Sequence, residues 1–311
     1  MKIDGYEFMA DIVAKFFNSV RISGWFHHPE DSLIAVAIIG CPQTGCVSEV
    51  GLPHGGVENL GPNKGFLIQF LQPEEGFPES AELQFTTRFG QTLRANLMEV
   101  AKDRQTHNTT PGMSKRFIAA VNETGGRVLD IGGRARSRVD RSLVYTGAEC
   151  TVLDILPGDN VDVVGDAHAL ARYFPPDPFD AIWSVSVFEH LMMPWAVVLQ
   201  MNIVLKTGGT ALIATHQTLG MHDMPWDFWR FSDTAWDALF NRFTGFEIVE
   251  RTLDFGQFIV PFVYRPDKSI AERAAGYELS VVVVRKTGPA SITWPLTPAD
   301  INDSMYPEGV E

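Results

Sequence analysis

The spacing of apolar side chains divides the chain into two parts. From about residue 20 to residue 100, short β-rich runs such as SLIAVAII, GFLIQFL and AELQFTT alternate with clusters of glycine and proline. Strands at this spacing predict a small β-sandwich accessory domain over residues 20–104. Before it, Phe8, Ile12, Val13, Phe16 and Phe17 lie close to helical spacing, which predicts an amphipathic helix over residues 1–19.

After a polar stretch predicted as a linker, residues 105–113, strand and helix patterns alternate. RVLDIGG, CTVLDI, FDAIWSVSV and TALIAT predict strands, and SKRFIAAVNE and WAVVLQMNIVL predict helices. FEIVERTL and YELSVVVVRK add two strands near the end. This alternation predicts an α/β domain over residues 114–287, with a mainly parallel sheet covered by helices on both faces, followed by an extended tail over residues 288–311.

Composition and charge exclude several classes of partner. The net charge of −13 repels a polyphosphate backbone, so we expect no nucleic acid partner. No apolar run approaches the roughly 20 residues of a membrane span. The N-terminus does not resemble a signal peptide, and the three cysteines fit a reducing compartment, so we expect a cytoplasmic location. The sequence leaves open whether copies of the chain form a homo-oligomer.

Acidic residues follow three of the predicted strands. Asp130 precedes a glycine turn, Asp154 ends the next strand 24 residues later, and Asp166 follows a further short strand. Ligands of open α/β sheets collect at the carboxyl ends of the strands, where an acid at the end of the second strand can accept hydrogen bonds from both hydroxyls of a ribose. The order of these acids therefore indicates a nucleotide-like cofactor.

Five motifs carry a resemblance to a known family. VLDIGG, LDI, GDAHAL, FDAIWSVSVFEHL and LKTGG, in this order, resemble the motifs of class I S-adenosylmethionine-dependent methyltransferases. The resemblance implies a Rossmann-like seven-stranded sheet with an antiparallel hairpin at its end, and S-adenosyl-L-methionine as the cofactor. It also implies cofactor contacts from Asp130, Ile131, Gly132, Gly133, Arg134, Asp154, Ile155, Asp166, Ala167 and Ser184.

The glycine loop departs from the family pattern. Arg134 and Arg136 occupy the second and third glycine positions of acid-x-Gly-x-Gly-x-Gly. The loop must therefore take a different path, or the cofactor site is altered. A methyltransferase-like fold without activity, serving as a binding or scaffold protein, is the alternative that this departure motivates.

A histidine follows the fourth strand of the domain. Transfer of a methyl group to a hydroxyl requires alignment of donor and acceptor and removal of the hydroxyl proton, and an imidazole suits that task. His190 is the first candidate for the base, and His216 and His222 are further catalytic candidates. The alternative is that Glu189 and His190 only cap the following helix.

Aromatic and polar residues alternate in the segment after the fifth strand. The pattern P-x-D-x-W-R-F, starting at Pro225, resembles methyltransferases associated with sugar and surface-polysaccharide modification. Glu189, Trp226, Asp227, Trp229 and Arg230 are predicted to bind the acceptor, and the alternative is a hydrophobic lid in which Asp227 and Arg230 pair.

The same segment holds residues that suit a metal ion. His216, His222 and Asp223 could ligate a divalent metal, as in metal-assisted O-methyltransferases, but no metal is assigned. The predicted activity is methyl transfer to a hydroxyl of a sugar or glycan. The acceptor could instead be a small natural product or an amine.

Overall fold

The computed structural model describes residues 1–16, 19–54, 56–72, 77–101, 109–135, 140–257, 259 and 276–301. Two compact units divide the chain. Apart from residue 259, the described residues of the first unit lie within Met1–Gln105, and the second unit consists of Thr106–Gln257 with Gly276–Glu311.

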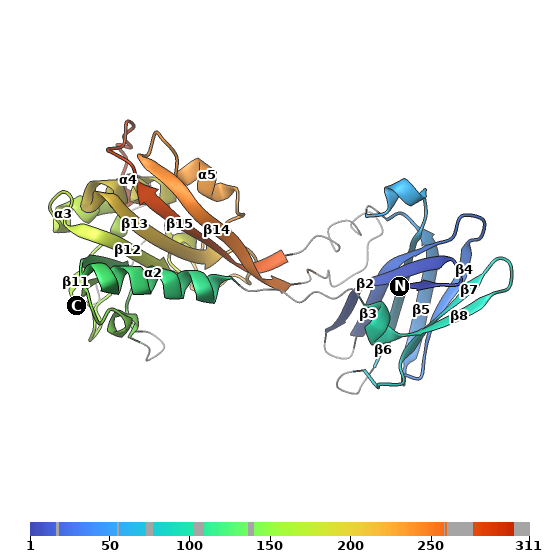
Figure 1. Ribbon diagram of the computed structural model, residues 1–311. Coiled ribbons are helices and arrows are strands. Elements are labelled where there is room, and N and C mark those ends of the chain that lie inside the picture. Colours follow the sequence, from blue (N-terminus) through green and yellow to red (C-terminus); the bar gives the residue numbers. More distant parts are fainter. Residues whose placement is uncertain are drawn as a thin grey trace. The chain divides into compact units, whose positions relative to one another are not determined.

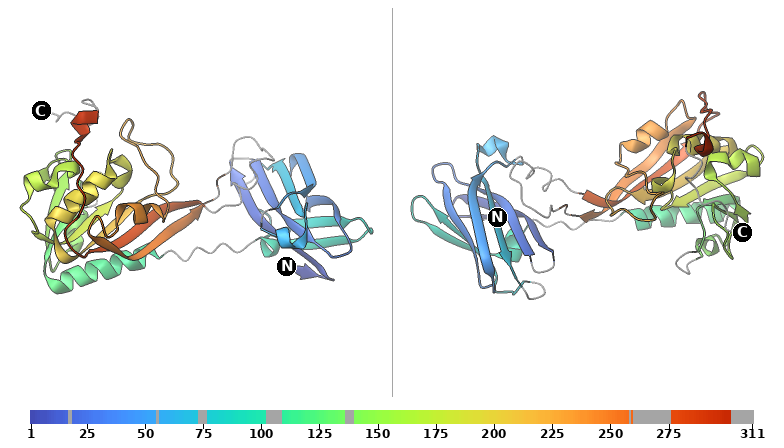
Figure 2. Two further views of the ribbon diagram at one scale, coloured as in Figure 1. Left: turned by 90° about the horizontal axis from the view of Figure 1, so that it is seen from above. Right: turned by 180° about the vertical axis from the view of Figure 1, so that it is seen from behind.

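The described part of the first unit contains two antiparallel sheets. The larger sheet has the order β1-β2-β3-β6-β5, and the smaller has the order β4-β7-β8. Figure 2 shows this unit in blue and teal from two sides. The strands of the larger sheet are β1 (Lys2–Ile3), β2 (Tyr6–Phe16), β3 (Ser19–His27), β6 (Gly65–Leu71) and β5 (Thr44–Leu52). Those of the smaller sheet are β4 (Leu33–Ile39), β7 (Glu82–Thr87) and β8 (Thr92–Asn96), and the short helices are η1 (Glu58–Leu60) and α1 (Leu97–Val100).

One hydrophobic cluster fills the space between these two sheets. Phe8 and Phe66 of the larger sheet and Phe85 of the smaller sheet are fully buried in it. The ring centroids of Phe8 and Phe85 lie 4.7 Å apart. Burying one such side chain contributes about 1.5–3 kcal/mol, so this cluster stabilises the packing of the two sheets.

The prediction of a helix over residues 1–19 is wrong. The chain forms strands β1 and β2 there, and Tyr6, Phe8, Ala10 and Ile12 alternate with less buried neighbours along β2. The spacing of four between Phe8 and Ile12 fits a helix and a strand equally, because four is also a multiple of the strand period of two. Phe17 lies outside the described residues.

The second unit is built on a seven-stranded sheet of order β11-β10-β9-β12-β13-β15-β14. Strands β11, β10, β9, β12 and β13 are parallel, and β15 is antiparallel to both of its neighbours. This is the sheet that the resemblance implied, with an antiparallel hairpin at one edge. The strands are β9 (Arg127–Ile131), β10 (Glu149–Asp154), β11 (Val163–Val164), β12 (Phe179–Val185), β13 (Leu205–His216), β14 (Phe246–Gln257) and β15 (Gly276–Lys286).

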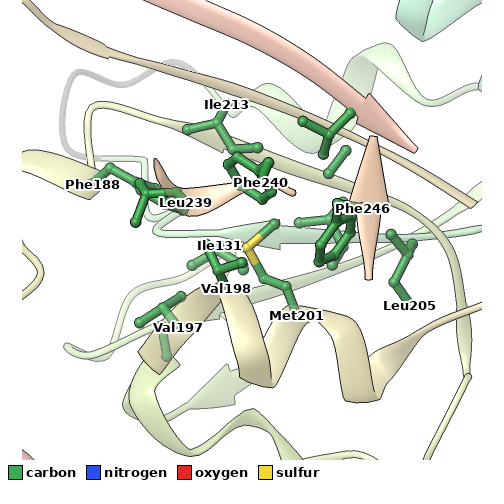
Figure 3. Packing of buried hydrophobic residues seen from close by; sticks show 14 of the residues in the cluster. Ile131, Phe188, Val197, Val198, Met201, Leu205, Ile213, Leu239, Phe240 and Phe246 are labelled. Carbon is green, nitrogen blue, oxygen red and sulfur yellow. The ribbon is translucent and has the colours of Figure 1, made fainter. Parts of the chain in front are cut away.

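Helices cover both faces of this sheet, as predicted (Figure 1). On β9, Leu129 and Ile131 join one hydrophobic cluster, whereas Val128 joins the other. The first cluster includes residues of α4 and α5, and some of its members are drawn in Figure 3. Helix α2 covers the second. The helices are α2 (Thr110–Thr124), α3 (Leu170–Tyr173), α4 (Pro194–Val204), α5 (Ala235–Leu239) and α7 (Pro298–Ile301), with 3-10 turns η2 (Arg141–Val144), η3 (Ala167–Ala169) and η4 (Phe188–His190).

The last part of the predicted linker, residues 105–113, is wrong where the structure describes it, because α2 already begins at Thr110. Pro111 had suggested a break, but proline is well tolerated in the first turn of a helix, where no intrahelical partner exists for its missing N–H. The Asp254 carboxylate accepts a hydrogen bond from the Thr110 amide and thereby caps the helix from strand β14.

The tail after β15 is described to residue 301. Trp294 packs edge-to-face on Trp195 of α4, with ring centroids 5.6 Å apart, and α7 follows. In the part of the chain that the structure describes, no helix is both long and apolar enough to cross a membrane.

Candidate functional site

The glycine turn after β9 is shaped by a close approach to the end of β12. Gly132 has a φ of +71°, and a Cβ atom at this position would lie 2.2 Å from Cγ2 of Val187. Its amide donates a hydrogen bond of 2.7 Å to the Leu153 carbonyl of β10. Only glycine combines this backbone conformation with this lack of space, so the turn brings backbone to the edge where the parallel strands end.

A cavity of about 340 Å³ lies at this edge. It is lined by Ile131, Gly132, Arg134, Leu153, Asp154, Ile155, Leu156, Gly165, Asp166, Ala167, Ser186, Val187, His190, Leu191, Asp223, Met224 and Trp226. The volume falls in the range of small-ligand sites, and the wall is mainly apolar with a few carboxylates and one imidazole.

Asp154 ends β10 on the wall of the cavity, and its carboxylate is held in place from both sides. Oδ1 accepts a hydrogen bond of 3.0 Å from the Leu156 amide, and Oδ2 accepts one of 3.3 Å from the Arg134 amide. The Arg134 Nε also lies 3.4 Å from Oδ1. A carboxylate has about four acceptor sites, so both oxygens of Asp154 keep capacity for further donors.

Asp166 is oriented by a histidine that the sequence reasoning did not single out. The Met193 amide donates to Nε2 of His168 at 3.2 Å, so Nε2 carries no proton. The proton therefore sits on Nδ1, which donates to Oδ1 of Asp166 at 2.7 Å. The spacing Asp-Ala-His, with the aspartate as cap of η3, was the available signal.

Asp130 does not line the cavity, although the resemblance implied a cofactor contact there. Its side chain is fully buried, and neither carboxyl oxygen has a hydrogen-bond partner among the described residues. Burial raises the pKa of Asp130 to about 7, and Arg141, with its Nε 3.8 Å from Oδ2, counteracts part of that effect. The Arg141 guanidinium also donates to the carbonyls of Gly132 and Val185, at 2.7 and 3.1 Å, and so joins the ends of β9 and β12.

His190 lies on the cavity wall in the turn η4. Its Nδ1 lies 2.7 Å from the carbonyl oxygen of Trp226, so Nδ1 donates, and the other ring nitrogen, Nε2, lies 3.8 Å from Oε1 of Glu189. The Glu189 carbonyl accepts hydrogen bonds from the Phe228 and Trp229 amides, at 2.8 and 3.1 Å. These bonds attach the aromatic segment after β13 to the turn that carries His190.

Glu189 is fully buried behind this turn. Thr215 donates a hydrogen bond to its Oε2, and the Nε2 of His216 lies 3.1 Å from its Oε1. Burial alone would raise the pKa of Glu189, but the neighbouring His216 and Thr215 more than offset this and hold the pKa below its usual value.

Asp227 and Arg230 form a bidentate ion pair, with contacts of 2.6 and 2.8 Å. The Arg230 guanidinium holds the pKa of Asp227 well below its usual range. This pairing is one part of the alternative prediction, a hydrophobic lid in which Asp227 and Arg230 pair. Trp229 donates from Nε1 to the Leu191 carbonyl at 2.8 Å.

The structure brings only some of the predicted site residues to the cavity. Those that line it are Ile131, Gly132, Arg134, Asp154, Ile155, Asp166, Ala167, His190 and Trp226. Those that do not are Asp130, Gly133, Ser184, Glu189, His216, His222, Asp227, Trp229 and Arg230. Arg136 lies outside the described residues. Ser184 is buried inside the sheet, and Ser186, two residues further along and with a φ of 56°, faces the cavity in its place.

Comparisons with known proteins match the second unit. Residues 106–256 match the family model described as a methyltransferase domain. The match indicates a methyltransferase domain with S-adenosylmethionine as its cofactor, as predicted. A search of the curated proteins found no match to the chain.

Solved structures similar to this chain include three bacterial and archaeal proteins. A SAM-dependent methyltransferase from Archaeoglobus fulgidus is 14% identical, with a TM-score of 0.41, over 57% of this chain and 93% of that one. The YcgJ protein of Bacillus subtilis is 16% identical, with a TM-score of 0.38, over 56% and 99%. The 1,6-didemethyltoxoflavin-N1-methyltransferase of Burkholderia thailandensis is 16% identical, with a TM-score of 0.39, over 56% and 77%.

The residues of the cavity fit this cofactor. Gly132 presents backbone without a side chain on the cavity wall, and Asp154 presents a buried carboxylate at the end of β10. Leu153, Ile155 and Ala167 supply apolar wall for a flat ring system. Backbone, carboxylate and apolar surface are what a nucleoside with a charged side chain requires.

Proposed function

We propose that the protein transfers the methyl group of S-adenosylmethionine to a hydroxyl group of a sugar or glycan. The observation that carries this proposal is the position of His190 on the wall of the same cavity as Asp154 and Asp166. A cavity that combines acids for a ribose and an adenine with an imidazole suits a reaction between a cofactor and a second small molecule.

When bound, S-adenosylmethionine supplies a methyl carbon that its sulfonium makes electrophilic. Asp154 would hold the ribose hydroxyls through the remaining acceptor capacity of its carboxylate, and Asp166 would face the adenine. The acceptor oxygen would take this methyl group and the cofactor would leave as S-adenosylhomocysteine, so the chain's own part is to align the two and to take the hydroxyl proton. The hydroxyl proton passes to Nε2 of His190, whose Nδ1 is held by the Trp226 carbonyl.

The part of the cavity beside His190 supports a sugar-like acceptor. Trp226 offers an indole and Asp223 a carboxylate on the same wall. Sugars present an apolar C–H face and directed hydroxyl groups, and an aromatic ring beside a carboxylate complements both.

One observation favours a second function, a binding or scaffold protein without activity. Arg134 stands where the family pattern has glycine, and its Nε lies 3.4 Å from an oxygen of Asp154 that a ribose would use. In this alternative, the ion pair would keep the cofactor from binding.

Calorimetric titration of the intact protein with S-adenosylmethionine separates these functions, and absence of binding would leave only the scaffold. If the cofactor binds, release of S-adenosylhomocysteine is measured with nucleotide sugars, glycans, amines and small natural products as acceptors. We expect turnover with a sugar hydroxyl, and turnover with amines alone would overturn that acceptor.

His190→Gln tests the assigned base, because glutamine keeps hydrogen-bonding capacity but does not take up a proton. We expect turnover to fall about 10²–10⁴-fold, the usual contribution of a general base, with cofactor affinity nearly unchanged. Equal turnover would remove His190 from the mechanism.

A further inference from the structure

Three potential metal ligands converge behind the His190 turn. They are Glu189 of η4, His216 at the end of β13, and His222 in the segment that follows. One ligand atom from each lies within 4.8 Å of the others. We infer that these three side chains form a binding site for a divalent transition-metal ion.

The carboxylate of Glu189 is the first reason. The residue is fully buried, and its Oε2 accepts a hydrogen bond from Thr215. Its Oε1 has no hydrogen bond of regular geometry among the described residues and faces the Nε2 atoms of His216 and His190, at 3.1 and 3.8 Å. Buried carboxylate oxygens are normally paired or bound to metal, because their desolvation is otherwise uncompensated. A cation shared by Oε1 and the neighbouring imidazole would compensate this buried charge.

The separation between Glu189 and His216 is the second reason. The Oε1 and Nε2 atoms are 3.1 Å apart. Ligand atoms bound at about 2.0–2.2 Å to one tetrahedral ion lie about 3.3–3.5 Å from each other. The two side chains therefore need to move by only a few tenths of an ångström to share an ion.

The third ligand is already oriented by its surroundings. Nδ1 of His222 lies 3.1 Å from the Gly220 carbonyl oxygen, and the His222 amide donates to Oδ2 of Asp227 at 2.9 Å. Donation from Nδ1 leaves the lone pair on Nε2. Histidine ligands usually donate their other ring N–H to a carbonyl or carboxylate in this way.

The chemistry of the three ligands selects the class of ion. Two imidazole nitrogens and one carboxylate oxygen favour zinc and its first-row neighbours, whereas magnesium and calcium prefer oxygen ligands. Three protein ligands leave at least one coordination position open.

The site lies next to the wall of the cavity, because the rings of His190 and His222 are 4.9 Å apart, centroid to centroid. Resting on the proposed function, the open position would bind an oxygen of the acceptor and make its proton easier to remove. The sequence had suggested His216, His222 and Asp223, but Asp223 is not in the cluster, and Glu189 takes its place.

The test uses the full-length protein after treatment with a chelator. Titration with Zn²⁺, Co²⁺ and Mg²⁺ is followed by calorimetry and, for Co²⁺, by the visible absorption of the bound ion. We expect one Zn²⁺ or Co²⁺ per chain, at least tenfold weaker binding of Mg²⁺, and a higher unfolding temperature in the presence of Zn²⁺.

His222→Ala should weaken Zn²⁺ binding tenfold or more. The side chain of His222 is 31% exposed, so its removal should leave the core intact. Thermal unfolding of the metal-free variant checks that its stability equals that of the metal-free wild type. Glu189→Gln should have the same effect, and Asp223→Asn is the matched control that should bind Zn²⁺ like the wild type.

Absence of stoichiometric Zn²⁺ and Co²⁺ binding, or binding unaffected by His222→Ala, would overturn the inference. Loss of binding in Asp223→Asn alone would also overturn this ligand set. Cofactor binding is measured on the same samples. A protein that binds Zn²⁺ but not S-adenosylmethionine would refute the proposed function and leave the metal site standing.

Discussion

Arg134 and Asp154 meet on the wall of the cavity, where the arginine Nε lies 3.4 Å from the aspartate Oδ1. The Arg134 side chain lies across Gly158, at which a Cβ atom would be 2.8 Å from the arginine Cγ. The arginine that replaces a family glycine is thus accommodated by a glycine elsewhere in the chain. Its backbone amide also donates a hydrogen bond of 3.3 Å to Oδ2 of Asp154.

Replacing Asp154 tests the cofactor end of the cavity. Asp154→Ala removes a carboxylate that would accept two hydrogen bonds from the ribose, and each hydrogen bond to a charged group contributes about 1.5–3 kcal/mol. We expect the dissociation constant for S-adenosylmethionine, measured by calorimetry, to rise at least tenfold. Asp159→Ala, at an exposed position in the following loop, is the control and should leave the dissociation constant unchanged.

Gly132→Ala tests the turn at the end of β9. The added Cβ would lie 2.2 Å from Val187, and the φ of +71° is unfavourable for alanine. We expect a lower unfolding temperature and weaker cofactor binding. Gly208→Ala is the matched control, because Gly208 has a φ of +86° with no atom near the added Cβ. Equal losses in the two variants would mean that backbone conformation alone, and not the contact with Val187, explains the effect.

Asp254→Ala tests the cap of α2. The buried Asp254 carboxylate accepts hydrogen bonds from Thr110 and Thr252, so we expect a loss of about 1–3 kcal/mol in the free energy of unfolding. Thermal or urea unfolding measures this loss. Asp237→Ala breaks an ion pair with Arg251 in which the Asp237 side chain is 58% exposed, and it should have little effect. A larger loss in Asp237→Ala would contradict the assigned cap.

The contribution of Asp254 to the stability of the fold depends on pH in a direction that follows from its lowered pKa. Burial alone would raise the pKa of Asp254, but the hydrogen bonds from Thr110 and its neighbours lower it below its usual value. Its stabilising contribution is therefore complete above the unfolded pKa of about 3.9 and is lost as the pH falls through the lower folded pKa. The stability difference between wild type and Asp254→Ala should shrink below about pH 4, and a constant difference down to pH 2 would refute the shift.

The raised pKa of Asp130 predicts that the stability of the folded protein changes with pH in the opposite direction. Burial raises its pKa to about 7, so the folded protein keeps the proton where the unfolded chain has lost it. Stability should fall as the pH rises from about 4 to about 7, by up to about 1.4 kcal/mol per pH unit, and then level off. Asp130→Asn removes this loss, so its unfolding temperature relative to wild type should rise over that interval. Parallel pH profiles would show that Asp130 is ionised throughout.

Local patterns were sufficient for much of the second unit. The sheet follows from apolar strands alternating with helices, and Asp154 and Asp166 could be placed at the cavity because each lies at or just after the carboxyl end of a parallel strand. Asp130 shows the limit of this reasoning, since a residue at the end of a strand can face either side of the sheet. Here it is buried away from the cavity, beside Arg141.

The sequence by itself determined the α/β class of the second unit and the edge of the sheet at which the cavity lies, because periodicity and strand-end acids are encoded over a few neighbouring residues. Only the tertiary structure decided that Phe8 and Ile12 lie on a strand, since a spacing of four suits both periods and packing against Phe85 selects one. It also decided which side chains meet across long separations, as Asp254 meets Thr110 and Glu189 meets His216. No local pattern contains such pairs, because they form when the strands of one sheet align and bring distant segments to the same edge.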